Sequence, residues 1–367
     1  MHRLRMWLAI GGIAAACALV ACAAVNPYYD PAKPHHTPTG FRNNDIGTVS
    51  KSLGDLLRWF TARRENPPTM PQPTPIVAAD TAFLHANAQA STAMVPTATW
   101  IGHATLLVQA GGLNVLTDPI FSERASPVGF MGPRRLQPPG LAMDQLPHID
   151  VVVVSHNHFD HLDRNSALLL AAQAGGPPLF LVPLGIKPWF SQLGIDHVVE
   201  LDWWQSHAVA GTEFFLTPVQ HWSGRSLTDR HHALWGGWAV FAPAFQWYFS
   251  GDTGYSQDFV RTRQHFADRQ RDGGFDLALI AIGAYEPNWF MKDQHVNPRE
   301  AVRIHQDIGS RHSIGMHWGT FDLSDEANDQ PPGDLARERR ALGIADSAFE
   351  VLAIGQTRRL PRRPAGP

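Results

Sequence analysis

The chain has 367 residues, of which 44% are hydrophobic, so it is long enough and apolar enough to bury a sizeable core. This composition excludes a disordered protein. Its 30 basic and 33 acidic residues give a formal net charge of -3, which leaves no excess of positive charge to hold a polyphosphate backbone. Nucleic acid is therefore not expected as a partner. Its 19 histidines fall partly in short clusters beside aspartate, which is a first indication of metal chemistry.

The first predicted element is an apolar segment at the start of the chain. Arg3 and Arg5 precede an almost wholly apolar run at residues 6–21, and Cys22 follows that run. This arrangement resembles a bacterial lipoprotein signal, which is cleaved in front of a cysteine that then carries lipid. We therefore expect residues 1–21 to be a signal peptide and Cys22 to be the site of lipidation. An uncleaved membrane helix is the alternative.

The positions of the two cysteines restrict the chemistry of the mature protein. Both Cys17 and Cys22 lie in the signal-like segment, so cleavage would leave only Cys22, and no structural disulfide is expected. Any zinc site must then use histidine and carboxylate ligands. A lipidated Cys22 would tether the protein to a membrane surface in the bacterial cell envelope. Ala23 stands where an Asp would retain a lipoprotein at the inner membrane, which favours the outer membrane.

Residues 22–95 are predicted to form an N-terminal extension or linker, because they are rich in proline and polar residues. Within them, residues 53–60 carry apolar side chains at helical spacing. We expect this helix to dock on the body of the protein. Docking on a membrane surface is the alternative.

The main domain is predicted over residues 96–357, followed by a flexible tail at 358–367. Residues 105–109 and 113–117, separated by Ala110-Gly111-Gly112, predict a β-hairpin, and the valines at 151–154 predict a strand buried on both faces. Strands interspersed with helices predict an α/β body whose helices cover the outer faces of the sheets. Further strands are predicted at residues 179–182, 213–217, 238–241, 247–250, 277–280 and 313–317, and helices at about 164–172, 257–266, 298–308 and 333–342.

Four candidate metal ligands follow directly on the valine strand: His156, His158, Asp160 and His161. The end of a strand is where ligands converge in α/β architectures. Alternate residues of an extended segment point the same way, so His156 and His158 can bind one metal ion together. Asp160 and His161 lie where the chain turns into the next helix and can serve a second ion. Neutral imidazole and carboxylate are ligands that zinc accepts.

Three more candidate ligands follow later strands. His221 comes after the strand at 213–217, Asp252 after the strand at 247–250, and His317 closes the strand at 313–317. Glycines on both sides of Asp252-Thr253 would let the backbone approach a metal closely. All seven residues are therefore expected at one edge of the fold. The alternative is a set of hydrogen-bonded core histidines and carboxylates.

The order of these seven residues resembles the metal-ligand series of the metallo-β-lactamase superfamily. The resemblance implies a four-layer αββα sandwich that holds two Zn²⁺ ions. It implies a first site of His156, His158 and His221, a second site of Asp160, His161 and His317, and a bridge at Asp252. It also implies that Asp118 supports the ligand loop as a hydrogen-bond acceptor. For His103 a supporting or structural role is preferred over direct catalysis.

The stretches between the ligands narrow the resemblance to the family of N-acyl-phosphatidylethanolamine-hydrolysing phospholipase D, roughly from Phe41 to Ile354. The resemblance implies an enzyme that uses metal-activated hydroxide to release N-acylethanolamine and phosphatidic acid from its phospholipid substrate. The predicted lipid on Cys22, and not the resemblance, would tether this enzyme to the membrane. The motifs that carry it are Trp-Ile-Gly-His-Ala-Thr at 100–105, Leu-Thr-Asp-Pro-Ile-Phe at 116–121, Arg-Ala-Ser-Pro at 124–127, Leu-Asp-Trp-Trp at 201–204, Gly-Asp-Thr-Gly-Tyr at 251–255, Ile-Gly-Ala-Tyr-Glu-Pro at 282–287 and His-Trp-Gly-Thr-Phe at 317–321.

The same resemblance assigns roles around the substrate. Asp160 and Asp252 are assigned to catalysis at the metal centre. Gln294 and His295 are assigned to recognition of the phosphate or the amide, and His295 also to catalysis. An ordinary surface or capping role is the alternative for His295. Phe159 is expected next to the substrate, where the related animal enzymes have Tyr.

Two other functions are compatible with the sequence. One is a hydrolase of the same fold that opens lactones or cleaves other phosphodiesters. The other is a non-catalytic envelope lipoprotein, against which the complete ligand set argues. The sequence gives no indication of the oligomeric state.

Overall fold

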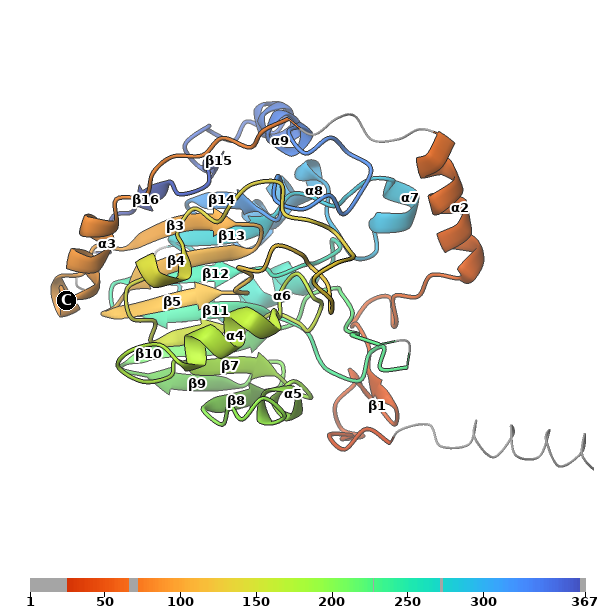
Figure 1. The fold of residues 1–367 in the computed structure, drawn as a ribbon, viewed down its shortest axis with the longest axis horizontal. Helices are drawn as coiled ribbons and strands as arrows, with labels where there is room; N and C mark the ends of the chain where they lie inside the picture. Colours follow the sequence, from red (N-terminus) through yellow and green to blue (C-terminus); the bar gives the residue numbers. More distant parts are fainter. Residues whose placement is uncertain (1–24, 66–71, 227, 271–272, 364–367) are drawn as a thin grey trace, which may run out of the picture.

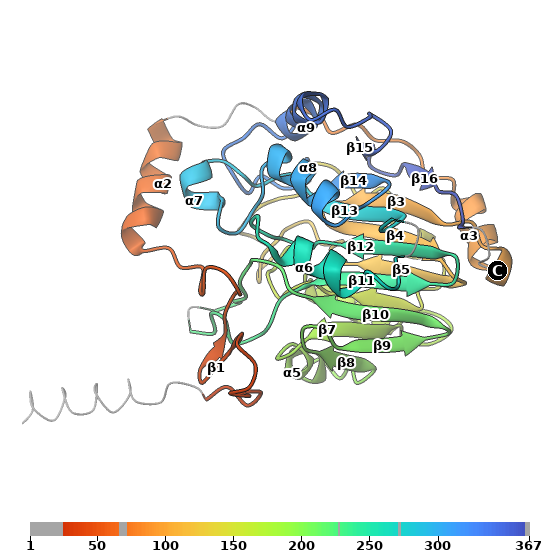
Figure 2. The same cartoon turned by 180° about the vertical axis from the view of Figure 1, so that it is seen from behind.

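The computed structural model describes residues 25–65, 72–226, 228–270 and 273–363. Two seven-stranded sheets lie face to face, with helices on their outer faces (Figures 1 and 2). This is the four-layer αββα sandwich that the sequence predicts. The predicted signal peptide at 1–21 and the predicted lipidation site Cys22 lie outside the described residues. Among the described helices, none combines the length and the apolarity that crossing a bilayer requires.

The first sheet begins as an antiparallel meander and continues as a parallel sheet. Its parallel strands carry helices on one face and the second sheet on the other, so both faces are buried and the strands consist of unbroken apolar runs. In spatial order the strands are β16 (Thr357–Arg359), β3 (Thr97–Gly102), β4 (Thr105–Ala110), β5 (Leu113–Thr117), β6 (Val151–Val153), β7 (Leu179–Pro183) and β8 (Val198–Leu201).

The second sheet is parallel at one side and antiparallel at the other. Between the two sheets lies a core that includes the fully buried Trp100, Trp235, Trp238 and Trp247. In spatial order the strands are β15 (Phe349–Val351), β14 (Ser313–Met316), β13 (Leu277–Ala281), β12 (Phe245–Phe249), β11 (Gly237–Ala242), β10 (Thr212–Thr217) and β9 (Ser206–Val209).

The helices form the two outer layers. Figures 1 and 2 show α4 (Arg164–Ala171) over the first sheet, and α6 (Asp258–His265) and α8 (Pro298–Asp307) over the second. The amphipathic segment predicted at 53–60 forms α2 (Leu53–Glu65), which lies at the periphery beside α7 (Asn288–Met291). The remaining helices are α3 (Thr81–Ala88), α5 (Lys187–Ser191), α9 (Gln330–Ala341) and the short 3-10 turns η1 (Ser91–Ala93) and η2 (Met143–Gln145).

The strand ends that carry the predicted ligands meet at one edge of the sandwich. The strands β10, β12 and β14 run in the same direction, so their carboxyl ends share one edge of the second sheet. The end of β6 in the first sheet reaches the same edge, because the indole of Trp238 donates a hydrogen bond to the carbonyl of Val154. The strand predicted at 313–317 ends one residue earlier, since His317 has a φ of 61° and leaves the sheet.

The C-terminal boundary predicted at residue 357 coincides with the start of β16. Residues 358 and 359 continue that strand against β3. Beyond it, Arg363 Nε lies 2.7 Å from a carboxylate oxygen of Asp276. The described part of the predicted tail is therefore bound to the body.

The described part of the predicted extension packs against the body through a buried polar cluster. It contains the short strands β1 (His36–Thr37) and β2 (Gly40–Phe41). Lys33 Nζ, His35 Nε2 and His36 Nε2 lie 2.6, 2.7 and 3.0 Å from the carboxylate of Asp202. Burial alone would raise the pKa of Asp202, but the hydrogen bonds from His35 and Lys33 outweigh it and hold that pKa well below its ordinary value. The ionised Asp202 thus fixes residues 33–41 to the body.

Replacing this carboxylate tests how strongly the extension is held. Asp202→Asn should lower the free energy of unfolding by about 3 kcal/mol near pH 7, because it removes the partner of two histidines and a lysine in a buried cluster. The folded-state pKa is depressed, so the stabilisation is present above the ordinary value of 3.8 and is lost as the pH falls below it. Thermal unfolding from pH 7 to pH 3 should show a constant difference between the two proteins that begins to narrow below the ordinary value of 3.8.

The control is Asp196→Asn, which removes an exposed carboxylate just before β8. It should leave the unfolding temperature unchanged at every pH. Equal effects of the two substitutions would contradict the role given to Asp202.

Candidate metal centre

The structure brings all seven predicted ligands together at the shared edge of the sheets. Among the described residues, five groups of side chains have ligand atoms within 4.8 Å of one another, and two of these groups contain the predicted ligands of the two sites. The first group contains His156, His158 and His221. The second group contains Asp160, His161, His317 and also His103.

Asp252 lies between the two groups and contacts both. Its Oδ2 atom is 3.0 Å from His161 Nε2, and its Oδ1 atom is 3.1 Å from His317 Nε2. The same Oδ2 is 3.9 Å from the Nε2 atoms of His156 and His221. One carboxylate therefore faces both groups of ligands.

The first group is a set of neutral imidazoles that point at one another. His158 Nδ1 lies 2.8 Å from His156 Nε2 and 3.3 Å from His221 Nε2. Burial lowers the pKa of His158 to about 3 and the pKa values of the other two well below the ordinary value. Three uncharged imidazoles with converging nitrogens are an arrangement that a divalent cation fits.

In the second group, the carboxylate of Asp160 lies among histidines, and the carboxylate of Asp252 lies beside the same histidines. Asp160 Oδ2 lies 3.4 Å from His161 Nε2 and 3.5 Å from His317 Nε2. Burial alone would lower the pKa of His317, but the charge of Asp252 and the contacts of both carboxylates with the imidazole raise that pKa to about 9. His161 Nε2, His317 Nε2 and Asp252 Oδ1 are buried and have no hydrogen-bond partner. A cation would satisfy these atoms, so the residues fit a metal at this position as well.

The ligand loop is positioned by the end of β6 and by Asp118. Asp118 is fully buried, and its carboxylate accepts hydrogen bonds from the backbone N–H of Ser155 (2.7 Å) and from Ser155 Oγ (2.5 Å). It also lies 2.6 Å from His161 Nδ1, which turns His161 Nε2 toward the centre. Asp118 thus contacts the ligand loop at both Ser155 and His161. Gly251 packs against this turn, since a Cβ there would lie 2.5 Å from Ser155 Cβ.

His103 contacts a ligand and not the cavity. Its Nε2 atom lies 3.0 Å from Asp160 Oδ2, and its ring stacks obliquely on His317 at 4.0 Å between centroids. Burial lowers the pKa of His103 to about 3, so it is neutral and can donate one hydrogen bond to Asp160. This geometry agrees with a supporting role.

The extension supplies a residue to this centre that the sequence did not indicate. Asn43 is buried and forms two hydrogen bonds of 2.9 Å with the backbone N–H and C=O of His221. Its Oδ1 also accepts a bond from the indole of Trp235 at 3.0 Å. His221 Nδ1 lies 2.9 Å from the carbonyl of Gln294, which leaves Nε2 for the centre. Asn43 and Gln294 together fix both the backbone and the ring of His221.

Arg225 is a second residue that the sequence did not indicate. Its Nη1 atom donates hydrogen bonds of 2.8 Å to the carbonyls of Asn157 and Leu162, at the two ends of the ligand loop. Its guanidinium lies over the rings of Phe159 and Trp189, at 4.1 and 5.1 Å from their centroids. The predicted substrate residue Phe159 therefore lines a neighbouring cavity with Arg225 and Trp189.

The two ligand groups face a cavity of about 420 Å³ with polar and apolar parts. Polar side chains form one part of the lining: His158, Asp160, Asp252, Gln294, His295, Lys51 and Arg230. Apolar side chains form the rest: Leu56 and Trp59 of α2, Phe290 and Met291 of α7, Trp222, Ala284 and Leu323. A mostly apolar cavity with a few convergent polar groups is typical of a binding site for an organic ligand.

The predicted substrate residues Gln294 and His295 both line this cavity. His295 Nδ1 lies 3.8 Å from Asp252 Oδ2 and is buried without a hydrogen bond. Burial lowers the pKa of His295 to about 4, so it is neutral at neutral pH. Its Nδ1 is therefore available to a bound ligand.

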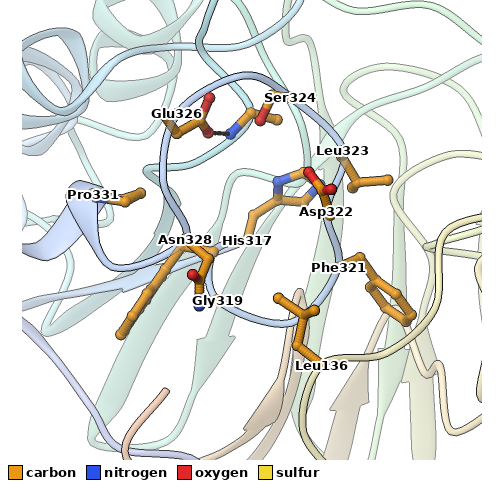
Figure 3. Close-up of a pocket in the computed structure, with 12 residues that line it drawn as sticks. Leu136, His317, Gly319, Phe321, Asp322, Leu323, Ser324, Glu326, Asn328 and Pro331 are labelled. Atoms are coloured by element: carbon orange, nitrogen blue, oxygen red, sulfur yellow. Dashed lines mark hydrogen bonds between the residues drawn. The ribbon is translucent and has the colours of Figure 1, made fainter. Parts of the chain in front are cut away.

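A smaller pocket of about 110 Å³ is lined by His317 and by residues between 318 and 331 that follow it, among others, and Figure 3 shows this pocket. The partly buried Glu326 accepts hydrogen bonds there from the backbone N–H groups of Ala284 (2.6 Å) and Glu286 (3.0 Å). Ala284 lines both this pocket and the larger cavity. Glu326 therefore fixes one wall of the cavity beside the metal ligands.

Comparison with known proteins relates this site to hydrolases. Residues 113–318 match a family model described as the beta-lactamase superfamily domain. The chain is 39% identical over 271 residues to N-acyl-phosphatidylethanolamine-hydrolyzing phospholipase D 1 of Caenorhabditis elegans, covering 71% of this chain and 74% of that protein. It is 38% identical over 257 residues to the mitochondrial N-acyl-phosphatidylethanolamine-hydrolyzing phospholipase D of Saccharomyces cerevisiae, covering 68% of this chain and 53% of the yeast protein.

A solved structure supports the fold. The isothiocyanate hydrolase from Delia radicum gut bacteria superposes with a TM-score of 0.57 at 18% identity, over 71% of this chain and 98% of the hydrolase. At this identity the likeness extends to the fold alone.

Asn43→Ala tests the contribution of the extension to the centre. The substitution should weaken retention of metal roughly 10- to 100-fold, because His221 loses the two bonds that fix its backbone. The measurement is competition for metal with a chromophoric chelator, at a temperature where the variant is folded. The neighbouring Asn44→Ala, which removes only a bond to Asp258, is the control and should bind metal as the wild type does. Wild-type affinity in Asn43→Ala would contradict the role of Asn43.

Proposed function

The chain belongs to the beta-lactamase superfamily and, within it, to the family of N-acyl-phosphatidylethanolamine-hydrolysing phospholipase D, and from that premise we propose that it is a membrane-tethered di-zinc phosphodiesterase. Its proposed reaction is the hydrolysis of N-acyl-phosphatidylethanolamine to N-acylethanolamine and phosphatidic acid. The observation that carries the proposal is the position of Asp252 beside a largely apolar cavity. Its carboxylate lies 3.0 and 3.1 Å from the ring nitrogens of His161 and His317 in the second group, and 3.9 Å from those of His156 and His221 in the first.

The residues divide naturally between two metal ions. His156, His158 and His221 would hold one Zn²⁺, and Asp160, His161 and His317 the other, with Asp252 shared. When bound, the pair supplies a water of lowered pKa and positive charge for the phosphodiester oxygens.

The chain's own residues keep the ligands in position for that chemistry. Asp118 accepts the Nδ1–H of His161, and the carbonyl of Gln294 accepts the Nδ1–H of His221, so both rings present Nε2 to the centre. The carboxylate of Asp252 can also accept a proton from water and orient it toward phosphorus. The hydrogen bonds from Arg225 to the carbonyls of Asn157 and Leu162 would hold the ligand loop between them in place when substrate enters.

The cavity lining suits an acylated phospholipid. Lys51 and Arg230 add positive charge near the metal ligands, where the phosphate would lie. The Nδ1 atom of His295 and the side chain of Gln294 can form hydrogen bonds with the phosphate or the amide. Apolar side chains of α2 and α7 would contact the acyl chains, since burial of methylene groups is favourable.

The location of the protein forms part of the same proposal. A lipid on Cys22 would tether the mature chain to the bacterial cell envelope, and Ala23 favours the outer membrane. Such tethering keeps the enzyme at the surface that contains its substrate.

Asp252→Asn tests the proposal through both metal and activity. The wild type should contain about two zinc ions per chain and release N-acylethanolamine together with phosphatidic acid from a panel of lipids. The variant should lose roughly 100-fold or more in rate, because the shared carboxylate is gone. Asp268→Asn, which changes an exposed carboxylate, should retain wild-type rate and metal. Hydrolysis of lactones or other phosphodiesters in place of this lipid, or of no substrate at all, would contradict the proposal.

His295→Gln separates substrate recognition from metal binding. The variant should keep the wild-type zinc content, because His295 is not one of the seven predicted ligands, although it lies in a further group with Asp252 and His317. It should lose roughly 10- to 100-fold in kcat/KM. Elemental analysis and steady-state kinetics on the same preparation check both points. If zinc is lost in proportion to activity, His295 is a ligand and its assigned role is wrong.

A further inference from the structure

The exposed apolar side chains of the described residues concentrate in one segment. Six of the twelve large hydrophobic side chains that are exposed among the described residues lie between residues 25 and 60: Val25, Tyr29, Ile46, Leu53, Leu57 and Phe60. A soluble surface normally carries such side chains singly, and a group of them marks a surface that binds something apolar. This segment comes directly after the predicted site of lipid attachment.

The helix α2 has two faces with different surroundings. Leu53, Leu57 and Phe60 are 79, 67 and 55% exposed and follow the i, i+4, i+7 spacing of one helix face. On the other face, Leu56 and Trp59 line the cavity at the metal centre. The helix is therefore one wall of the cavity, and its outer face is apolar.

Polar and aromatic contacts fix α2 in this place. Trp59 stacks on Phe290 at 4.9 Å and donates a bond of 2.9 Å to Asp325. Arg63 lies 2.8 Å from Asp322 and 3.0 Å from Asp325. The outward direction of Leu53, Leu57 and Phe60 is thus set by contacts on the inner face.

Positive charge accompanies the apolar face. Arg58 is exposed next to Leu57, with its guanidinium 4.2 Å from the centroid of the Trp289 ring. Lys51, just before the helix, is paired with Asp293 at 2.9 Å and lines the cavity on the inner face. Apolar side chains flanked by basic ones are typical of helices that lie in the surface of a bilayer with anionic lipids.

We infer that α2 lies in the surface of a lipid bilayer, with Leu53, Leu57 and Phe60 among the acyl chains, so that the cavity at the metal centre opens onto the membrane. The inference rests on the proposed function, because a bilayer contact at α2 would give a phospholipid substrate a short path along this helix to the metal ligands. The contact of α2 with the bilayer differs from the proposed lipid anchor at Cys22, because this contact sets the orientation of the enzyme on the membrane and not only its attachment.

An environment-sensitive fluorophore at residue 57 tests this contact directly. Leu57→Cys and Leu169→Cys in the full chain are labelled with a nitrobenzoxadiazole maleimide and mixed with substrate-free vesicles of phosphatidylcholine and phosphatidylglycerol. Leu169 is the matched control, because it is a leucine 54% exposed on α4. The label at 57 should brighten and shift to the blue, and the label at 169 should not. The wild type, treated identically, corrects for label on its own cysteines. No change at 57, or the same change at both positions, overturns the inference.

Activity gives a second readout. Leu57→Asp should lose roughly tenfold in hydrolysis of N-acyl-phosphatidylethanolamine in vesicles, and should match the wild type on a short-chain monomeric analogue. Leu169→Asp should match the wild type on both substrates. A loss on both substrates by Leu57→Asp would show a structural role and overturn the inference, as would sedimentation showing that Leu57→Asp dissociates a dimer of the wild type. If the wild type hydrolyses neither substrate, the proposed function fails, and the fluorophore still decides the membrane contact.

Discussion

The central constraint on this structure is the burial of two carboxylates among histidines at the junction of two sheets. Asp160 and Asp252 lie within 3.5 Å of imidazole nitrogens in a place with little access to water. An uncompensated charge of this kind would be very unfavourable in the protein interior. The arrangement therefore needs positive charge between the side chains, which divalent cations bound by these ligands would supply.

The centre depends on residues that never touch a metal. Asp118, Asn43 and Arg225 hold the ligands through hydrogen bonds to rings or to backbone atoms. They come from the first sheet, the N-terminal extension and the loop after His221, so parts of the chain that are far apart in sequence are fixed by one site. The N-terminal extension is therefore part of the site. Asp202 holds residues 33–41 of the extension, Asn43 forms hydrogen bonds with the backbone of His221, and α2 lines the cavity.

The sequence predicted the fold and the convergence of the ligands because both depend on local patterns. Valine runs give buried strands, and a histidine after a strand is carried to the sheet edge. Asn43 was not predictable, because it bonds to the backbone of His221, and any residue there would offer the same peptide group. The cavity that Phe159 lines was also not predictable from the residues beside it in the sequence, because its ring packs under Arg225, which lies 66 positions later. The strands β8, β9 and β16 have weak apolar patterns, since they lie at or near the edges of the sheets and are partly exposed.

In the proposed mechanism, a phospholipid passes from the apolar outer face of α2 through the largely apolar cavity to the pair of cations. The central claim of this mechanism is the pair of cations, and anomalous X-ray diffraction at the zinc edge from crystals of the purified protein tests it most directly. The account predicts two anomalous peaks, one among His156, His158 and His221 and one among Asp160, His161 and His317, with Asp252 touching both. A single peak, or none after growth in zinc-replete medium, would contradict it.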